Sequence, residues 1–171
     1  MKIALIYPNM GDYRTKDAMT PLSMGILAAL SPGHDIVFYD ERLESLPLTL
    51  PAVDLVAISI ETFTARRGYQ LAARYRQQGI KVVVGGFHAT FMPDEVVEHA
   101  DSVVIGDAEG AWEQLLLDVG RGELQPRYEG SRQRSLEQYQ LDRSIFTGKR
   151  YAPLALIQYS RGCRFTCDFC S

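Results

Sequence analysis

Short apolar runs alternate with helix-like segments through the first 120 residues, and the connections between them are short. Runs of this length are too brief for buried helices and suit strands that are covered on both faces. The predicted strands are Lys2–Tyr7, Asp35–Tyr39, Asp54–Ile60, Lys81–Val84 and Ser102–Ile105. The alternation predicts an α/β domain over residues 1–120, with a doubly wound, five-stranded parallel sheet.

The helix-like segments carry start and stop signals. The first begins near Thr20, the predicted cap, and ends at Pro32-Gly33. A second is predicted over Thr64–Gln78, where Gly79 supplies the left-handed stop. A short helix follows Pro93, and a last one is predicted over Glu109–Val119 with an apolar face.

Beyond residue 120 the pattern changes. Residues 121–153 have no clear periodicity and are interpreted as a linker, in which Arg127–Glu129 is a possible extra strand and Leu141–Phe146 is expected to pack locally. Leu154–Ser160 reads as a strand that leads into a third unit, residues 154–171.

Ligands of open parallel sheets bind outside the carboxyl ends of the strands. The candidate binding residues in the loops there are Ser59, Glu61, Thr62, Phe63, Thr64, Gly85, Gly86, His88, Gly106 and Glu109. Glycines at such a place let a ligand approach the backbone, although tight turning explains them equally well. Neither GxGxxG nor GxxxxGK[ST] follows the first strand, which argues against a dinucleotide or P-loop site.

All three cysteines stand near the end of the chain, and Cys163, Cys167 and Cys170 have CxxxCxxC spacing. Three thiolates can hold three irons of a 4Fe-4S cluster and leave the fourth iron open to a chelating molecule. Zinc with a fourth ligand from elsewhere is the alternative, although structural zinc sites usually pair two short knuckles. The odd cysteine count and the absence of a signal-peptide pattern argue against disulfides.

The cysteine spacing, with Phe169 directly before Cys170, resembles the CxxxCx(aromatic)C signature of radical S-adenosylmethionine (radical SAM) enzymes. The resemblance implies a 4Fe-4S cluster whose open iron binds S-adenosylmethionine, an electron donor such as flavodoxin or ferredoxin, and a small-molecule substrate. It also implies that residues 154–171 begin a partial barrel. Because the sequence stops at Ser171, it is expected to be part of a longer enzyme and inactive alone.

Three further stretches extend the resemblance. The sequences GGFHAT (85–90), GDAEG (106–110) and PLSMGILAAL followed by GHDIVFYD (21–40) resemble the cobalamin-binding domain that precedes the barrel in one group of radical SAM enzymes, many of them methyltransferases. This likeness implies a Rossmann-like domain that binds cobalamin at the sheet-end residues. The position of His88 at that end of the sheet favours a contact with the ligand's tail or phosphate over a plain surface residue. The DxHxxG motif is absent, so cobalamin is expected to bind without a histidine on cobalt.

Composition limits the remaining possibilities. No apolar run approaches the roughly 20 residues of a membrane span, and the composition is typical of a cytoplasmic protein. A net charge of −3 with dispersed basic residues argues against a nucleic-acid partner. Two alternatives stay open: a non-catalytic Rossmann-like binding module with a minor metal site, and a radical SAM enzyme whose domain no longer binds cobalamin.

Overall fold

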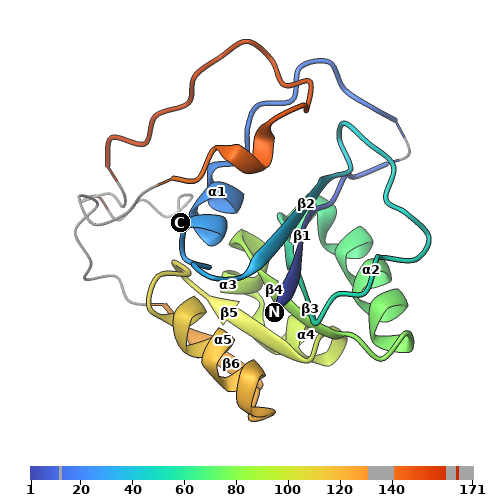
Figure 1. Ribbon diagram of the computed structural model, residues 1–171, viewed down its shortest axis with the longest axis vertical. Helices are drawn as coiled ribbons and strands as arrows, with labels where there is room; N and C mark the ends of the chain where they lie inside the picture. The colour runs from blue at the N-terminus through green and yellow to red at the C-terminus, as the bar shows by residue number, and fades with distance from the viewer. Residues whose placement is uncertain (12, 131–140, 161–164, 166–171) are drawn as a thin grey trace.

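The computed structural model describes residues 1–11, 13–130, 141–160 and 165. The predicted cluster ligands Cys163, Cys167 and Cys170 lie outside the described residues. The described part of the chain forms one α/β domain with helices on both faces of a twisted sheet (Figure 1).

A parallel sheet of six strands lies at the centre of the domain, in the order β2-β1-β3-β4-β5-β6. The strands are β1 (Lys2–Tyr7), β2 (Asp35–Asp40), β3 (Leu55–Ser59), β4 (Lys81–Gly85), β5 (Ser102–Ile105) and β6 (Arg127–Glu129). The predicted parallel α/β class is confirmed. The predicted count of five strands is one too low, because the possible extra strand Arg127–Glu129 is present as β6. The sixth strand, β6, pairs with β5 and places the side chain of Tyr128 in the core, where its hydroxyl donates to Asp118 over 2.8 Å.

Two pairs of helices cover the sheet, one pair on each face (Figure 1). The helices are α1 (Leu22–Ala29), α2 (Ala65–Gln77), α3 (Phe87–Phe91), α4 (Pro93–His99) and α5 (Ala111–Arg121), with 3₁₀ turns η1 (Thr62–Thr64) and η3 (Ser144–Phe146). Helices α1 and α5 share one core cluster, and α2 and α4 share the other. The prediction of Thr20 as the cap of α1 is wrong, because Pro21 occupies that position. Within the described residues, no helix combines the length and the apolar character that crossing a membrane requires.

The two core clusters follow from the alternation of side chains along each strand. In β1, Ile3 and Leu5 face the α1–α5 side, while Ala4 and Ile6 face the α2–α4 side, and all four are fully buried. On the α1–α5 side lies the chain's single tryptophan, Trp112, whose indole N–H donates to Ser31 over 2.8 Å. A strand that is buried on both faces explains why these runs read as continuously apolar.

Part of the predicted linker folds back onto the domain, and we call residues 141–152 the strap. The strap begins where the Asp142 amide donates to the Gly25 carbonyl over 3.1 Å. Further along, the ring of Phe146 meets that of Phe38 in β2 edge to face at 5.7 Å. It ends where the Ala152 amide donates to the carbonyl of Ala18 over 2.8 Å. The local packing predicted for Leu141–Phe146 is therefore present, and its partners are α1 and β2.

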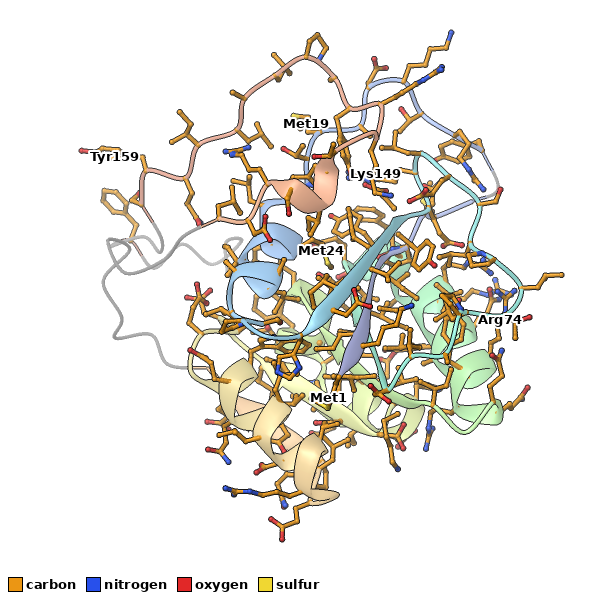
Figure 2. The ribbon with its side chains drawn as sticks, in the orientation of Figure 1. Met1, Met19, Met24, Arg74, Lys149 and Tyr159 are labelled. Carbon is orange, nitrogen blue, oxygen red and sulfur yellow. The ribbon has the colours of Figure 1, made fainter. Side chains whose placement is uncertain are left out.

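The segment after the strap does not form the predicted strand. Leu154–Ser160 has no strand pairing, and most of its side chains are exposed. Tyr159 is 96% exposed and projects away from the domain in Figure 2. A strand is stable only when a neighbour completes its hydrogen bonds, and no described residue supplies that neighbour.

Candidate functional site

The strand order reverses between β1 and β3. From β1 the chain passes to β2 on one side, and the next strand, β3, pairs with β1 on the other side. The carboxyl ends of these strands, at Tyr7 and Ser59, are therefore the topological switch point, where doubly wound sheets bind their ligands. The fold thus places the candidate site along this carboxyl edge.

The ends of β3 and β4 are joined by backbone contacts into what we call the ledge, residues Ser59–Glu61 and Gly85–His88. The Ile60 amide donates to the Gly85 carbonyl over 2.8 Å, and the His88 amide donates to the Ile60 carbonyl over 3.2 Å. Gly86 has φ of +101°, and a Cβ there would lie 2.5 Å from the Ile60 carbonyl oxygen. Glycine at position 86 is therefore required by protein packing, which differs from the predicted role of admitting a ligand.

A 3₁₀ turn follows the first half of the ledge. The Glu61 amide donates to the Thr64 hydroxyl over 2.9 Å, and that hydroxyl donates to the Glu61 carbonyl over 3.1 Å. The hydroxyl of Thr64 is thus used inside the turn, whereas Thr62 and Phe63 are exposed at the edge. Burial raises the pKa of the half-buried Glu61 carboxyl.

Thr90 links the ledge to the loop after β5, and the sequence patterns did not single it out. Its hydroxyl donates to the Gly86 carbonyl over 3.0 Å and accepts from the Gly106 amide over 3.0 Å. Gly106 is exposed at this edge, whereas Glu109, which precedes α5, is 2% exposed. The structure therefore brings the predicted site residues to one edge of the sheet, but it buries four of them: Ser59, Thr64, His88 and Glu109.

His88 is bonded within the protein. Its ring Nε2 lies 3.0 Å from the hydroxyl oxygen of Tyr69 and 3.5 Å from Oε1 of Glu95, and Tyr69 donates its own proton to Oε1 of Glu95 over 2.8 Å. The hydrogen bond from Tyr69 lowers the pKa of Glu95, while burial and the neighbouring carboxylate raise the pKa of Tyr69. At neutral pH the phenol is therefore the donor and the carboxylate the acceptor, which leaves the phenol oxygen to accept from His88.

On the β1–β2 side, the carboxylate at the end of β2 is already occupied. Asp40 is fully buried and receives two hydrogen bonds from the Arg42 guanidinium at 2.9 and 2.7 Å and one from the Arg42 backbone amide at 3.0 Å. It accepts a fourth from the Tyr151 hydroxyl at 2.9 Å. Dinucleotide-binding folds use a carboxylate at a similar place for the ribose. Because this one serves the strap, the structure agrees with the missing GxGxxG in arguing against a dinucleotide.

Two residues at the carboxyl end of β1, Tyr7 and Asn9, belong to the edge and were missed in the sequence analysis. The ring of Tyr7 lies beneath the Arg42 guanidinium, 4.5 Å from ring centre to carbon, and burial raises the pKa of its hydroxyl. The backbone amide of Asn9 donates to Glu41 over 3.3 Å, and Glu41 is paired with Arg67 of α2 at 2.6 Å. The position of Tyr7 as the last residue of the first strand was the available signal, because β1 borders the switch point.

Aromatic side chains are exposed beside the ledge, and we call Phe63, Phe87 and Phe91 the aromatic rim. They are 66%, 60% and 52% exposed, and the last two stack with ring centres 6.3 Å apart and planes 11° apart. The stacked pair Phe87 and Phe91 forms an exposed apolar surface, and such surfaces usually mark a place for a ligand or a partner. The fold defines a doubly wound α/β domain, and this edge of its sheet is the candidate ligand-binding site.

Comparisons with known proteins agree with this class. Residues 48–116 match the model of the B12-binding domain. The chain is 32% identical to bacteriochlorophyllide d C-12(1)-methyltransferase of Chlorobaculum tepidum over 88% of its length, and 32% identical to the C-8(2)-methyltransferase of that organism over 94%. It is 26% identical, over its whole length, to the anaerobic magnesium-protoporphyrin IX monomethyl ester cyclase of Rubrivivax gelatinosus. The chain spans 35%, 38% and 38% of these three proteins.

Metal-ligating side chains do not gather in the structure as described. Among residues 1–11, 13–130, 141–160 and 165, no group of three His, Cys, Asp or Glu side chains is placed to hold an ion. The predicted metal ligands Cys163, Cys167 and Cys170 are not among these residues. The cluster prediction therefore continues to rest on the spacing of the cysteines.

Proposed function

We propose that this chain binds cobalamin along the carboxyl edge of its sheet and forms the amino-terminal part of a radical SAM methyltransferase. One observation carries the cobalamin assignment. The B12-binding match, residues 48–116, contains the whole ledge, the whole aromatic rim and the loop at Gly106. The matched sequence is therefore the part of the chain that builds the candidate site.

The chemistry of the edge fits a large amphipathic macrocycle. The aromatic rim offers apolar surface to the face of such a ring system, while the exposed hydroxyl of Thr62 and the exposed backbone at Gly106 offer hydrogen bonds to its amide groups. Glu61, with its raised pKa, supplies a further polar contact. In this assignment Gly85 and Gly86 shape the edge, and the buried Thr64 and Glu109 support it from beneath.

All three histidines are engaged elsewhere, which supports binding without a histidine on cobalt. The His34 ring nitrogen lies 3.3 Å from the amino-terminal nitrogen, and the His99 ring stacks on Tyr69 at 4.0 Å. The ring Nε2 of His88 lies in the contact with Tyr69. We therefore expect the absorption spectrum of bound cobalamin to lack the bands of a histidine-ligated form.

The radical SAM part of the proposal rests on the cysteine spacing and on the two methyltransferases among the similar proteins. Cys163, Cys167 and Cys170 would hold a 4Fe-4S cluster with one iron open to S-adenosylmethionine. The cofactors, when bound, supply the radical and the methyl group, and the chain supplies position and shielding. An external electron donor such as flavodoxin or ferredoxin completes the requirement.

The names of the similar proteins suggest a substrate class. Two act on a bacteriochlorophyllide and the third on magnesium-protoporphyrin IX monomethyl ester, and all of these are cyclic tetrapyrroles. We extend the proposal to methyl transfer onto a carbon atom of a tetrapyrrole. Mass spectrometry of such a substrate, incubated with the complete enzyme and its cofactors, would reveal a product heavier by one methylene group.

An anaerobic titration of the 171-residue chain with cobalamin, followed by absorbance, tests the central claim. We expect saturable one-to-one binding, and we expect Thr62→Ala to weaken it several-fold because an exposed polar contact is lost. Thr147→Ala, an equally small change on the strap, is the matched control and should bind as the unaltered chain does. Absence of cobalamin uptake, or equal binding by all three chains, would contradict the assignment of this edge.

A further inference from the structure

A hydrogen-bonded cluster joins three helices beside the ledge. Tyr69 comes from α2, His88 from α3, and Glu95 and His99 from α4. The contacts run from His88 to the Tyr69 oxygen, from the Tyr69 hydroxyl to Glu95, and from the Tyr69 ring to the stacked ring of His99. The cluster is therefore the side-chain connection between α3 and the two helices that cover this face of the sheet.

From His88, the cluster extends through Tyr69 to His99, away from the candidate site. Helix α4 starts at the carboxyl edge after α3 and runs back toward the start of β5, so its last residue, His99, lies farther from that edge than Glu95. The Tyr69 ring stacks on His99. The ring Nε2 of His88 thus faces the helical layer, where it contacts Tyr69 and Glu95. Only 7% of His88 is exposed.

What His88 holds is a short helix that carries much of the candidate site. Helix α3 has five residues, too few to be stable alone, and it bears both Phe87 and Phe91 of the aromatic rim. The helix starts directly after Gly86, which packs against the backbone of Ile60. Its Thr90 hydroxyl accepts a hydrogen bond from the Gly106 amide. Any shift of α3 therefore moves the rim and the adjoining loop together.

We propose that His88 is a positioning residue, which fixes α3 and its aromatic rim through Tyr69 and Glu95, and that it does not contact the ligand itself. This inference rests on the proposed cobalamin site and replaces the direct contact that the sequence suggested for His88. It predicts that residues directed away from the edge control ligand affinity. Tyr69 and Glu95 are those residues.

The test compares substitutions at two residues of the cluster, Tyr69 and His88. We expect Tyr69→Phe, which removes one hydroxyl, to weaken cobalamin binding about tenfold, because α3 loses its anchor. We expect His88→Ala to weaken it by a similar factor, and His88→Gln, whose amide can still donate to Tyr69, to restore most of the affinity. Tyr159→Phe, the same change at a fully exposed position, should bind as the unaltered chain does.

A double variant separates positioning from direct contact. If His88 acts through Tyr69, His88→Ala combined with Tyr69→Phe should be no weaker than His88→Ala alone. A His88 that contacts the ligand independently of Tyr69 would instead give losses that multiply. Thermal unfolding of each variant, measured in parallel, shows that the compared chains are folded.

Amide hydrogen exchange in α3 tests the positioning role of His88 without requiring that cobalamin binds. The amides of His88, Thr90 and Met92 donate to carbonyls in and before α3, and they should exchange faster in Tyr69→Phe whether or not cobalamin binds. Failure of the unaltered chain to bind cobalamin would overturn the proposed function alone. Unchanged exchange and unchanged affinity in Tyr69→Phe would overturn the positioning role.

Discussion

The ledge and the end of β2 are neighbours on the same edge of the sheet, but they are held together in different ways. The ledge is built from backbone hydrogen bonds and from a glycine that lets two strand ends touch, as at Gly86 and Ile60. The end of β2 is held instead by charged and aromatic side chains. Asp40 binds Arg42 and Tyr151, and Lys149 of the strap pairs with Glu44. Figure 2 shows Lys149 on the strap beside β2.

The difference indicates which end of the edge is available to a ligand. At the end of β2 the carboxylates are consumed by their partners, and the strap covers the strand. At the ledge the backbone groups hydrogen-bond to one another. The exposed side chains of Thr62 and of the aromatic rim are therefore available to contact a ligand. Substitutions should therefore act through steric fit at the ledge and through charge at the end of β2.

The largest effect is expected from Gly86→Ala. The added methyl group would lie 2.5 Å from the Ile60 carbonyl oxygen, at a φ that side chains rarely adopt, so we expect a loss of about 3 kcal/mol or more in unfolding free energy. Gly120→Ala makes the same change where no atom lies within 4 Å, and it should stabilise α5 by about 0.5–1 kcal/mol. Denaturant titration measures both, and equal stability of the two variants would contradict the packed ledge.

A smaller loss is expected from Asp40→Asn at the opposite end of the comparison. The substitution leaves the Arg42 guanidinium without its buried counter-charge. Breaking such a pair lowers the free energy of unfolding by about 3 kcal/mol, or by somewhat less when part of the hydrogen bonding survives. Asp94→Asn, which removes an exposed carboxylate paired with Arg127, should change stability by less than about 0.5 kcal/mol. Chemical denaturation of both variants would show whether the end of β2 depends on charge.

The smallest effect concerns Glu61 and depends on pH. Burial raises the pKa of this carboxyl in the folded state, so its protonated form favours folding, and that contribution is lost as the pH rises through the raised pKa. Glu61→Gln, which stays neutral, should match the unaltered chain near about pH 4 and be more stable by a few tenths of a kcal/mol near about pH 7, because the site is half exposed. Melting curves across this range measure the difference, with Glu98→Gln as a control for removing a charge. A destabilised Glu61→Gln at neutral pH would mean that the ionised carboxylate is stabilised by the protein.

Much of the fold was predictable because burial on both faces makes β1, β3 and β4 continuously apolar. The sixth strand, β6, was harder to predict because it has three residues and its buried Tyr128 stands between exposed neighbours. Leu154–Ser160 shows the opposite case, in which strand-like composition lacks a pairing partner among the described residues. Local pattern therefore predicts a strand reliably only where the sheet supplies a neighbour.

The candidate site was predictable in its location and less so in its details. Strand alternation places the edge loops, because the carboxyl ends of parallel strands share one edge. The partner of His88 is Tyr69, 19 residues earlier on another helix, and no local spacing connects them. The glycine at position 86 was noticed for the right reason, its missing side chain, but the neighbour that requires it is Ile60 and not a ligand.

The strap also affects the order in which the domain is completed during synthesis. Tyr151 and Asp40 are 111 positions apart, and Lys149 and Glu44 are 105 apart, so a ribosome that has released β2 must add more than one hundred further residues before these pairs can form. Until then β2 is a bare outer strand, of the kind to which other nascent chains can adhere. We expect the closing of this flank to be the last step of folding, and chains interrupted before residue 141 to be the ones that need a chaperone.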